Sequence, residues 1–585
     1  MKKTGLFLTL AIAIGLCSGC NLFKYFDKKV NVYREKDVVD KQISLRYYFK
    51  QMHVPYIEVN EYYKEFFNIE LNFSKSNKEY KYALSDNEYI SFNVESNELS
   101  ILGLSSFAGL LEHTSENEKF FLHLDETNKG EEHLKTIDLD KYSINFYEEN
   151  DQIYAPLSLL SKFSGGLSLY NVAYNGKDVY VLDYDSILFS EERTTDYYGD
   201  KYSKKFSNIF FRNKDMAKYS YNELCFVFDN FRGETEKLIF GEEKFKELGL
   251  DGYLSTYYPE LKECLLATGR RKYGAGILSL FFGLDDGGHT GLLSYYPFLL
   301  VSLFTKVTGS ESLSELYHKV VDRDNDYEKV YSSCNFYRNT SLGTPGDYYY
   351  YLEQDSETAY IGFNSFDVDY NGWDNYYNAQ GSVPVETDTF AFVRDKLYKA
   401  KSGGAKNIIL DLSTNGGGDT NALSGLVGLF NKAKSNLTFK DTFNNYLITD
   451  NFSVDINLDG IFDEQDALEC QQFDFNIGVL TSRCSFSCGN LFPYMMSNLG
   501  YMLVGEQSGG GSCAISIETT AEGIGYARSS HLTLVDSNGD NIDKGIPVDY
   551  QIELKDSEYV DYYDASEFYN CSLMRQYLEE FYSNN

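Results

Sequence analysis

The pattern of apolar and polar positions changes about one third of the way along the chain. From about residue 40 to 190, short alternating runs recur, such as YISFNV at 89–94 and VYVL at 179–182. Alternation with a period of two is typical of strands with one face on a core and the other in water. Residues 41–190 are therefore predicted to form a small α+β domain.

Beyond residue 200, nearly continuous apolar runs alternate with segments of helical period. The expected strands are 359–363, 407–412, 476–480 and 501–504, and the expected helices are 261–284, 311–321, 389–400 and 488–498. Continuous apolar strands that alternate with helices are typical of βαβ units and a largely parallel sheet with both faces covered. We therefore predict an α/β fold for residues 200–575, with its core at 355–555.

The first twenty residues have the features of an export signal. Two lysines precede the eleven apolar residues 6–16, a stretch too short to span a bilayer, which takes about 20 helical residues. The stretch ends in LCSGC, which resembles a bacterial lipobox with Cys20 as the lipidated residue. The alternative is an ordinary secretory signal with an incidental cysteine. We predict a lipoprotein signal peptide at 1–20, a polar tether at 21–40, and a mature chain anchored by lipid to a bacterial membrane, outside the cytoplasm.

Charge and composition exclude some functions. The chain has 53 Lys+Arg against 87 Asp+Glu, a net charge of −34, which repels phosphate backbones, so nucleic acid is not an expected partner. The 52 Tyr and 42 Phe argue against a disordered chain. Eight cysteines remain beyond Cys20, and none forms a CxxC pair, so a thiolate zinc site is not expected. Their disulfide pairing stays open.

Three segments of the second half carry residue types suited to catalysis. LDLSTNGGG at 410–418 runs from a strand into glycines, whose amides can surround an anion, although a plain turn has the same pattern. TSRCSFSCGN at 481–490 places serines where a strand leads into a helix. A serine there suits a nucleophile whose oxyanion is held by helix-terminal amides, and a simple helix N-cap is the alternative. YMLVGEQSGGGS at 501–512 is a strand followed by a glycine-rich loop.

The order and spacing of these segments resemble the C-terminal processing peptidase family, including its tricorn-core branch. The family's "LDLR-N-GG", "(S/T)-x-S-A-x-E" and "VGE-T-G-G" motifs follow one another in the same way, and 359–366 and 543–549 extend the likeness to about 200 residues. The resemblance implies a crotonase-like ββα-type catalytic core with a mixed sheet. It also implies Ser487 as nucleophile, with the Cys488 and Gly417 amides as oxyanion donors. Cys488 as a nucleophile itself is an alternative that no resemblance supports.

The same resemblance guides the choice of the base. One branch of the family uses a lysine shortly after the VGE strand, but Gly511 stands there. The tricorn-like branch uses the histidine of a "DGHT" segment, which DDGGHT at 285–290 matches with one extra glycine, so His289 is the predicted base. The other histidines of this half are His318 and His531.

The resemblance also bears on the third member of the triad and on a further domain. The family places an acid just before its "GV-PD" segment, which implies Asp543 as the residue that orients the histidine, with Asp549 and Asp540 as competitors.

Many members carry a PDZ module between the histidine and the sheet. The interval 290–358 is short and reads as helical, so we expect that module to be missing.

A separate motif lies between the glycine turn and the serine. DINLDGIFDEQD at 455–466 follows the D-x-[DN]-x-[DN]-G pattern of EF-hand calcium loops and, with its terminal Asp, more closely resembles dockerin loops. An acidic surface turn is the alternative in so acidic a protein. The oxygen ligands implied for a structural Ca²⁺ are Asp455, Asn457, Asp459, Ile461 and Asp466.

The sequence as a whole predicts a serine-type peptidase that cleaves peptides or proteins without a cofactor. The alternative is a catalytically inactive lipoprotein that keeps the peptidase fold and binds peptides, which the missing lysine and Gly489 favour.

In the first half, QIYAPLSLL at 152–160 weakly resembles the small domain related to the copper amine oxidase N-terminal domain, and no metal follows from that likeness.

Overall fold

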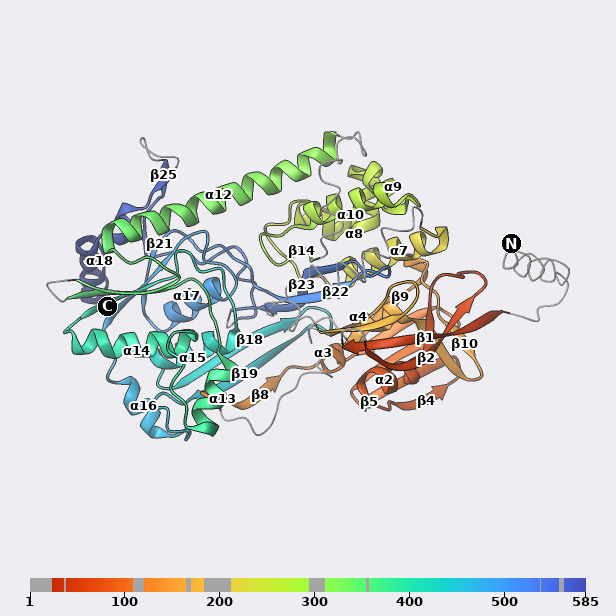
Figure 1. Ribbon diagram of the computed structural model, residues 1–585, viewed down its shortest axis with the longest axis horizontal. Helices are drawn as coiled ribbons and strands as arrows, with labels where there is room; N and C mark the ends of the chain where they lie inside the picture. Colours follow the sequence, from red (N-terminus) through yellow and green to blue (C-terminus); the bar gives the residue numbers. More distant parts are fainter. Residues whose placement is uncertain are drawn as a thin grey trace.

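The computed structural model describes residues 24–35, 38–108, 120–164, 170–183, 212–293, 311–353, 357–536, 538–556 and 562–584. Within these residues the protein is a mixed α/β structure with several sheets (Figure 1). The predicted signal peptide and Cys20 lie outside the described residues.

A six-stranded sheet forms the centre of the second half. Its order is β15-β16-β17-β20-β21-β24, and all neighbours are parallel except the antiparallel edge strand β15. The strands are β15 Tyr348–Leu352, β16 Thr358–Phe363, β17 Asn407–Asp411, β20 Asn476–Thr481, β21 Met502–Gly505 and β24 Tyr550–Gln551. The parallel, apolar strands expected from the sequence are thus present.

Helices cover both faces of this sheet, which explains why its strands are continuously apolar. Ile408 and Leu410 of β17 pack on one side into a core shared with α14, α15 and α17, whereas Ile409 packs on the other side against α12 and α18. These helices are α12 Glu311–Leu342, α14 Thr389–Ser402, α15 Thr420–Phe430, α17 Cys488–Asn498 and α18 Cys571–Asn584. Two shorter helices, α13 Tyr370–Ala379 and α16 Glu464–Cys470, lie in the same half.

A second six-stranded sheet joins the two halves of the chain. It runs β14-β23-β18-β19-β8, with β22 also paired to β23, and every pairing in it is antiparallel. The strands are β8 Leu122–Lys129, β14 Gly291–Leu292, β18 Lys434–Asp441, β19 Tyr446–Val454, β22 Cys513–Thr519 and β23 Gly525–Leu534. Because β8 comes from the N-terminal half, the two predicted units share this sheet.

The first half contains two further sheets, of seven and five strands. The seven-stranded sheet has the order β10-β11-β3-β2-β1-β13-β12, and the five-stranded sheet is β4-β5-β6-β7-β9. Their strands are β1 Tyr25–Glu35, β2 Val38–Tyr48, β3 Tyr56–Glu58, β4 Asn72–Ser76, β5 Glu79–Ser85, β6 Glu88–Asn93, β7 Glu98–Leu102, β9 Lys135–Asp138, β10 Tyr147–Glu149, β11 Gln152–Pro156, β12 Tyr170–Tyr174 and β13 Val179–Asp183. The helices are α2 Val59–Phe67, α3 Leu104–Ala108 and α4 Leu157–Ser164.

This part of the structure corrects the predicted tether at 21–40. Residues 25–35 form β1, which pairs antiparallel with β2 along its length, and Val30 and Val32 are buried. The charged residues that indicated a tether, such as Lys28 and Lys29, are exposed on this strand. A polar segment can therefore be strand when two or three apolar residues on one face find a core.

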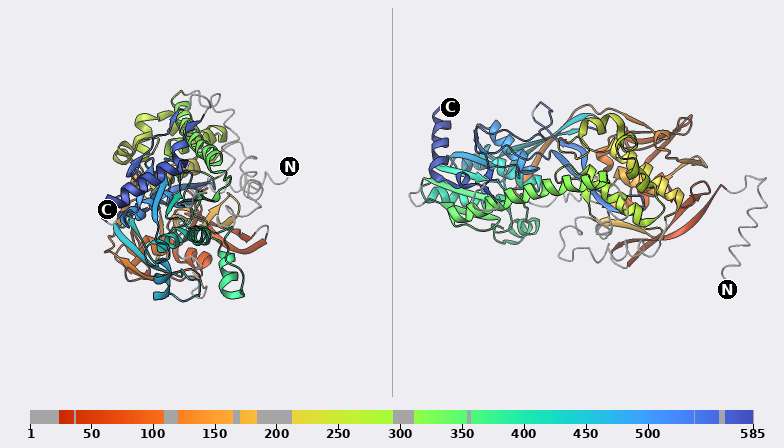
Figure 2. Two further views of the ribbon diagram at one scale, coloured as in Figure 1. Left: turned by 90° about the vertical axis from the view of Figure 1, so that its left-hand side faces the viewer. Right: turned by 90° about the horizontal axis from the view of Figure 1, so that it is seen from above.

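Four helices connect the halves and pack on the core of the first half. They are α7 Lys214–Asn230, α8 Glu242–Tyr257, α9 Pro259–Leu266 and α10 Arg270–Leu284. The single helix predicted at 261–284 is two, because the chain is extended at Ala267 and Gly269 between them. The interval before the central sheet contains α12, which runs along the molecule (Figure 2). It has 32 residues and is much longer than the predicted helix 311–321.

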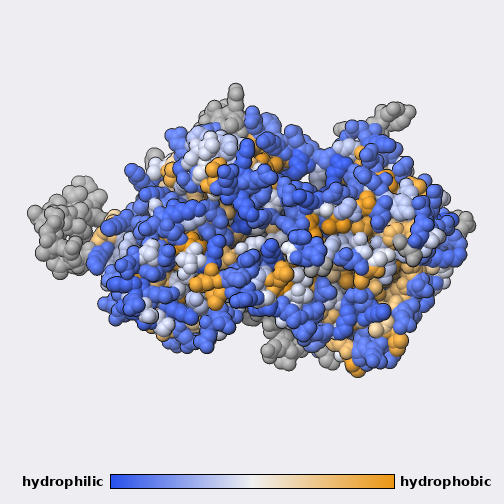
Figure 3. Space-filling model, turned by 180° about the vertical axis from the view of Figure 1, so that it is seen from behind, coloured by the Kyte–Doolittle hydropathy of each residue, from blue (hydrophilic) through white to orange (hydrophobic). Residues whose placement is uncertain are grey.

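The surface and the thiols add two observations. Hydrophilic residues dominate the face shown in Figure 3, with small apolar areas between them, as expected for a net charge of −34. In the described part of the chain, no helix is both long and apolar enough to cross a bilayer. The eight cysteines beyond Cys20 are all free thiols.

A buried charge cluster connects α4 to the β22–β23 pair. Glu518 is fully buried and contacts Lys162 at 3.2 Å and the Arg528 guanidinium, and it also accepts a hydrogen bond from Tyr526. Burial alone would raise the pKa of Glu518, but the two cations outweigh it and lower the pKa to about 2.

We expect Glu518→Gln to destabilise the protein by about 3–5 kcal/mol at pH 7, because it leaves two buried cations without their carboxylate. Since the folded-state pKa lies below the unfolded value, this stabilisation is present at neutral pH. It is lost as the pH falls from about 4.5 to about 2. Urea unfolding at several pH values measures the difference. Glu234→Gln, which breaks an exposed ion pair with Lys246, is the control and should change stability by less than about 1 kcal/mol. Equal effects of the two variants would contradict the role of the cluster.

Candidate active site

Ser487 lies at the sharp turn between β20 and α17. It occupies the N-cap position of α17 with φ 56° and ψ −120°, and its hydroxyl makes no capping hydrogen bond. A non-glycine residue with positive φ is strained by about 1–3 kcal/mol, and such strain is found where a side chain must be presented. The alternative interpretation of this serine as a helix cap is therefore wrong, and its hydroxyl is left available for chemistry.

Two neighbouring loops hold this turn in place. The Ser487 amide donates to the Gly510 carbonyl at 2.8 Å, and the Phe486 amide donates to the Asn415 carbonyl at 3.0 Å. A Cβ on Gly417 would lie 2.6 Å from the Ser487 Cβ, and one on Gly489 would lie 2.6 Å from the Asn415 carbonyl oxygen. Glycine is thus required at both positions for the loops to approach so closely, including at Gly489, where the sequence departs from the family.

The amides beside Ser487 could receive an oxyanion. Cys488 is the first residue of α17, and its amide has no hydrogen-bond acceptor among the described residues. The predicted second donor, the Gly417 amide, already donates to the Asn415 side chain at 2.8 Å. The next amide, that of Gly418, has no acceptor in the described part of the chain, and Gly418 lines the cavity beside Ser487. The geometry therefore favours Gly418 over Gly417 as the second donor.

His289 reaches the same region from the helical segment that precedes α12. The turn after α10 is closed by Asp286, whose Oδ1 accepts from the His289 and Thr290 amides at 3.1 and 2.9 Å. Its Oδ2 accepts from the Thr290 hydroxyl at 2.6 Å and from the Ser529 hydroxyl of β23 at 2.7 Å. Asp286 therefore fixes the backbone of His289 and attaches it to β23, a role that the sequence motif alone does not reveal.

Ser487 and His289 line one cavity of about 550 Å³. The Phe486 ring lies edge-on to the imidazole, with the ring centroids 4.8 Å apart. Burial lowers the pKa of His289 below its ordinary value of 6.5, and the charges of Asp286 and Asp543 oppose that shift only in part. The imidazole is thus neutral at pH 7, as a base must be.

Of the three candidate acids, Asp543 is the one that is buried and whose charge acts on His289. It is 2% exposed, and its carboxylate accepts from the Gly511 and Ser512 amides at 2.9 and 3.0 Å and from the Glu236 amide at 2.7 Å. Asp543 is also one of the two acids whose charge acts on His289. The competitor Asp549 instead caps the Leu503 amide at the start of β21, and Asp540 is exposed in a turn.

The structure adds a cation, Lys237, that no sequence motif indicated. Lys237 lines the same cavity, its Nζ donates to the Gly509 carbonyl, and burial lowers the pKa of its amine. The position where part of the family has lysine, Gly511, has φ +83°, and a Cβ there would lie 2.5 Å from the Phe486 ring. A lysine at 511 is therefore excluded on steric grounds, and Lys237 reaches the cavity from a different part of the chain.

Other candidates do not have suitable surroundings. The Cys488 thiol is buried, its Sγ contacts the Gly418 carbonyl at 3.2 Å, and burial raises its pKa to about 12, so it is not a thiolate at neutral pH. His318 is exposed on α12, and His531 is buried in β23 beside the rings of Phe231 and Phe443. Neither histidine lines the cavity.

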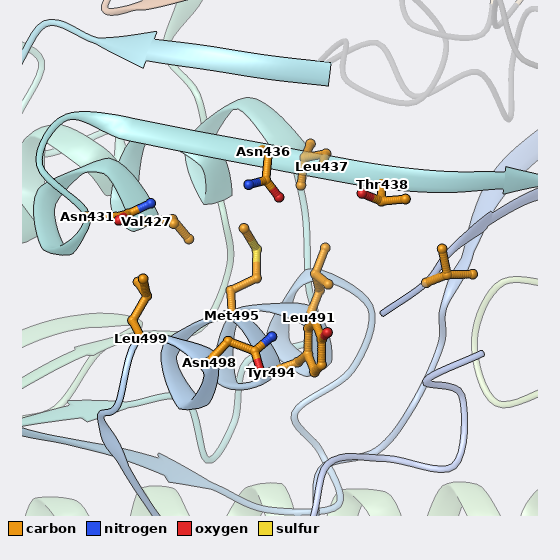
Figure 4. A pocket seen from close by; sticks show the side chains of 11 residues that line it. Val427, Asn431, Asn436, Leu437, Thr438, Leu491, Tyr494, Met495, Asn498 and Leu499 are labelled. Carbon is orange, nitrogen blue, oxygen red and sulfur yellow. The ribbon is translucent and has the colours of Figure 1, made fainter. Parts of the chain in front are cut away.

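A smaller cavity of about 270 Å³ lies between α15, β18 and α17. Figure 4 shows Asn436, Leu437 and Thr438 of β18 on one side of it and Leu491, Tyr494 and Met495 of α17 on the other. It contains none of the predicted site residues.

The predicted calcium loop folds as a series of tight turns before α16. Asp455 accepts from the Asp459 and Gly460 amides at 3.1 and 2.7 Å, and Asp466 reaches back to the Ile456 and Asn457 amides at 2.7 and 3.1 Å. The side chain of Ile461 is 57% exposed. In the part of the chain that the structure describes, no group of three or more His, Cys, Asp or Glu side chains is arranged to hold a metal ion. The loop's two buried carboxylates are thus engaged by its own amides, and calcium binding stays a prediction.

The fold and the cavity define a mixed α/β protein in which a strained serine and a buried histidine line one cavity. Residues 357–552 match the model of Peptidase family S41. This match, which covers less than half of the chain, agrees with the family that the motifs indicated, the C-terminal processing peptidases. His289 lies outside the matched residues.

Solved structures show more distant similarity. A candidate peptidase from Parabacteroides merdae is 17% identical over 58% of this chain and 90% of its own, with a TM-score of 0.37. The photosystem II D1 C-terminal processing protease is 17% identical over 36% and 49%, with a TM-score of 0.26. A lipoprotein from Streptococcus agalactiae is 13% identical over 59% and 95%, with a TM-score of 0.31. All three TM-scores are below 0.5, so neither fold nor activity is inferred from these proteins. The comparison with curated proteins gave no match.

The turn at Asp286 leads to a testable prediction. In Asp286→Asn, the amide nitrogen that replaces Oδ2 cannot accept from the hydroxyls of Thr290 and Ser529, so the His289 loop should loosen from β23. We expect the labelling of Ser487 by a fluorophosphonate to slow at least tenfold and its pH midpoint to shift, with the melting temperature lowered by only a few degrees. Asp322→Asn, an exposed site on α12, is the control. A wild-type labelling rate and midpoint in Asp286→Asn would show that the turn does not position His289.

The calcium loop is tested separately. If the loop binds Ca²⁺, the melting temperature rises with added Ca²⁺ and falls with a chelator, and Asp459→Ala removes the difference, because an ion that binds the folded state stabilises it. Mg²⁺ serves as the control ion. A melting temperature that does not respond to Ca²⁺ or chelator would leave the segment as an acidic turn.

Proposed function

We propose that the protein is a serine-type peptidase in which Ser487 is the nucleophile and His289 the general base. The observation that carries this proposal is the strained backbone of Ser487, with its uncapped hydroxyl, in the cavity that His289 also lines. A serine held on a strand-to-helix turn next to a histidine is the arrangement used for nucleophilic attack on acyl groups. The match of residues 357–552 to a peptidase family supports a peptide or protein as substrate.

The reaction follows from the groups around the cavity. His289 takes the proton of the Ser487 hydroxyl as its oxygen attacks the peptide carbonyl, and then returns that proton to the leaving amine. The Cys488 amide and the Gly418 amide donate to the oxyanion of the tetrahedral intermediate. Asp543, held by three backbone amides, stabilises the imidazolium that forms. Water then hydrolyses the acyl-enzyme, with His289 again as base, and no cofactor is needed.

Lys237 is the competing base. A buried lysine whose pKa is lowered can accept a proton from a serine, and Lys237 lines the same cavity. We assign the base role to His289 because its imidazole is neutral at pH 7, whereas the Lys237 amine donates to the Gly509 carbonyl. Variants of the two residues separate these assignments.

We expect a fluorophosphonate probe to label the purified protein and Ser487→Ala to abolish the labelling. His289→Ala should slow labelling by roughly 10²–10⁴-fold, the usual contribution of a general base, whereas Lys237→Met should retain most of it. Because the pKa of His289 is lowered, the base is deprotonated above that pKa. The labelling rate should therefore stay constant from pH 8 to 7 and fall only below pH 6.5. The measurement is the labelling rate as a function of pH.

The opposite outcomes are equally clear. If Lys237→Met loses labelling and His289→Ala does not, the base is Lys237. If the wild-type protein is not labelled while its melting temperature shows that it is folded, the protein is not a serine peptidase. It is then the inactive peptide-binding lipoprotein of the alternative hypothesis.

We further propose that the protein acts outside the cytoplasm, anchored by a lipid on Cys20. The support is the sequence alone, namely the short apolar stretch 6–16 followed by the lipobox-like LCSGC. Metabolic labelling with palmitate, and its loss in Cys20→Ser, tests the anchor independently of the peptidase.

A further inference from the structure

An exposed apolar cluster lies where the β1–β2 hairpin begins. Phe26, Phe49 and Met52 are 42%, 40% and 45% exposed. The Phe49 amide donates to the Lys24 carbonyl at 3.1 Å, and the rings of Phe26 and Phe49 lie 6.1 Å apart. Met52 follows in the turn after β2. Large apolar side chains that gather at one exposed end of a hairpin indicate a surface that a membrane or another molecule covers.

The β1–β2 hairpin is basic in an otherwise acidic protein. Residues 24–50 contain eight Lys and Arg against four Asp and Glu, whereas the whole chain carries −34. Arg34, Arg46 and Lys41 are neutralised by Asp40, Asp27 and Glu65, respectively. The exposed lysines without an ion pair among the described residues are Lys24, Lys28, Lys29 and Lys50. Exposed lysines interspersed with aromatic rings are typical of protein surfaces that contact anionic lipid headgroups.

The position of this end relative to the predicted anchor identifies what covers it. Tyr25, the first residue of β1, is five residues after Cys20, and five residues span at most about 17 Å. The start of β1 lies at one end of the long axis, and the central sheet lies towards the other (Figure 1). A lipid on Cys20 therefore brings the membrane surface to the hairpin rather than to the cavity.

We propose that the beginning of this hairpin, with Phe26, Phe49 and Met52 and the lysines 24, 28 and 50, is a second membrane-binding element that docks on anionic lipid headgroups. The proposal rests on the predicted lipidation of Cys20 for its geometry. The lysines attract the headgroup phosphates, and the apolar side chains enter the interface between headgroups and acyl chains. A second copy of the chain is a poor occupant, because it would place two sets of unpaired lysines against each other. Docking at this end would hold the catalytic cavity away from the bilayer.

The test uses the full mature chain, residues 20–585, with Cys20→Ser, so that only the protein surface can bind. Binding is measured by co-sedimentation with vesicles of phosphatidylcholine containing 30% phosphatidylglycerol and with vesicles of phosphatidylcholine alone. We expect binding to the anionic vesicles only, and its loss at high salt. Each lysine near an anionic surface contributes roughly a fivefold factor, so Lys24→Gln/Lys28→Gln/Lys50→Gln should weaken binding roughly 100-fold. Phe26→Ser/Phe49→Ser should weaken it about tenfold at unchanged charge.

The matched control removes three exposed lysines elsewhere, Lys319→Gln/Lys401→Gln/Lys432→Gln, and should bind as the parent chain does. The melting temperature reports that each variant is folded. The proposal is overturned if the parent chain binds anionic vesicles no better than neutral ones, which would leave the surface for an acidic protein. It is also overturned if the control triple weakens binding as much as the hairpin triple. The tested chain carries Cys20→Ser and therefore no covalent lipid. These outcomes are thus independent of whether Cys20 is lipidated and of whether Ser487 is reactive.

Discussion

The proposed active site depends on one buried carboxylate, that of Asp286, which fixes the loop of His289. Asp286 accepts four hydrogen bonds, two from amides of its own turn and two from hydroxyls, one of which belongs to β23. Without that attachment, His289, the proposed base, would lie on a loop after a helix, in a segment that shares its core with the first half of the protein. Ser487, the proposed nucleophile, adjoins a different core, around the central sheet. The hydrogen bond from Ser529 of β23 to Asp286 thus helps to fix the position of His289 relative to Ser487. Neither core determines that relative position alone.

The conformation of Ser487 likewise depends on contacts made by neighbouring segments. Its turn is bounded by the 412–418 loop on one side and the 508–511 loop on the other, and the glycines in both allow backbone to approach backbone. In the same place Ser487 has a positive φ, and the Cys488 and Gly418 amides have no acceptors among the described residues. The strain in one residue is therefore sustained by hydrogen bonds made by its neighbours, which is how an unfavourable conformation persists in a folded chain.

The elements that the sequence predicted best were those with an unambiguous local signal. α17 begins at Cys488 and ends at Asn498, as its pattern predicted, because a helix that follows a turn has a defined first residue. The continuous apolar strands were equally clear, since both of their faces are buried. β1 was missed because it contains few buried apolar residues, Val30 and Val32 among them, and its exposed charged residues indicated a tether. The pairing of β8 with β19 was missed because strand partners from distant segments leave no local trace. Lys237 and Asp286 were missed as site residues because their roles depend on contacts more than 240 residues along the chain.

The second sheet explains why the matched family region cannot supply the whole site. One edge of β23 pairs with β22. Its other edge pairs with β14, which continues from His289, and further along with β18, which leads through β19 to β8 of the first half. In β22, which pairs with β23, Glu518 contacts both Lys162 of α4 and Arg528 of β23. The N-terminal half therefore contributes to the surface on which the histidine loop is held. An isolated segment 357–552 would keep Ser487 and its amides but lose His289, the proposed base, and it would expose part of one edge of β23. The part of the chain that holds both proposed catalytic groups is accordingly larger than the matched region, and the first half helps to position His289.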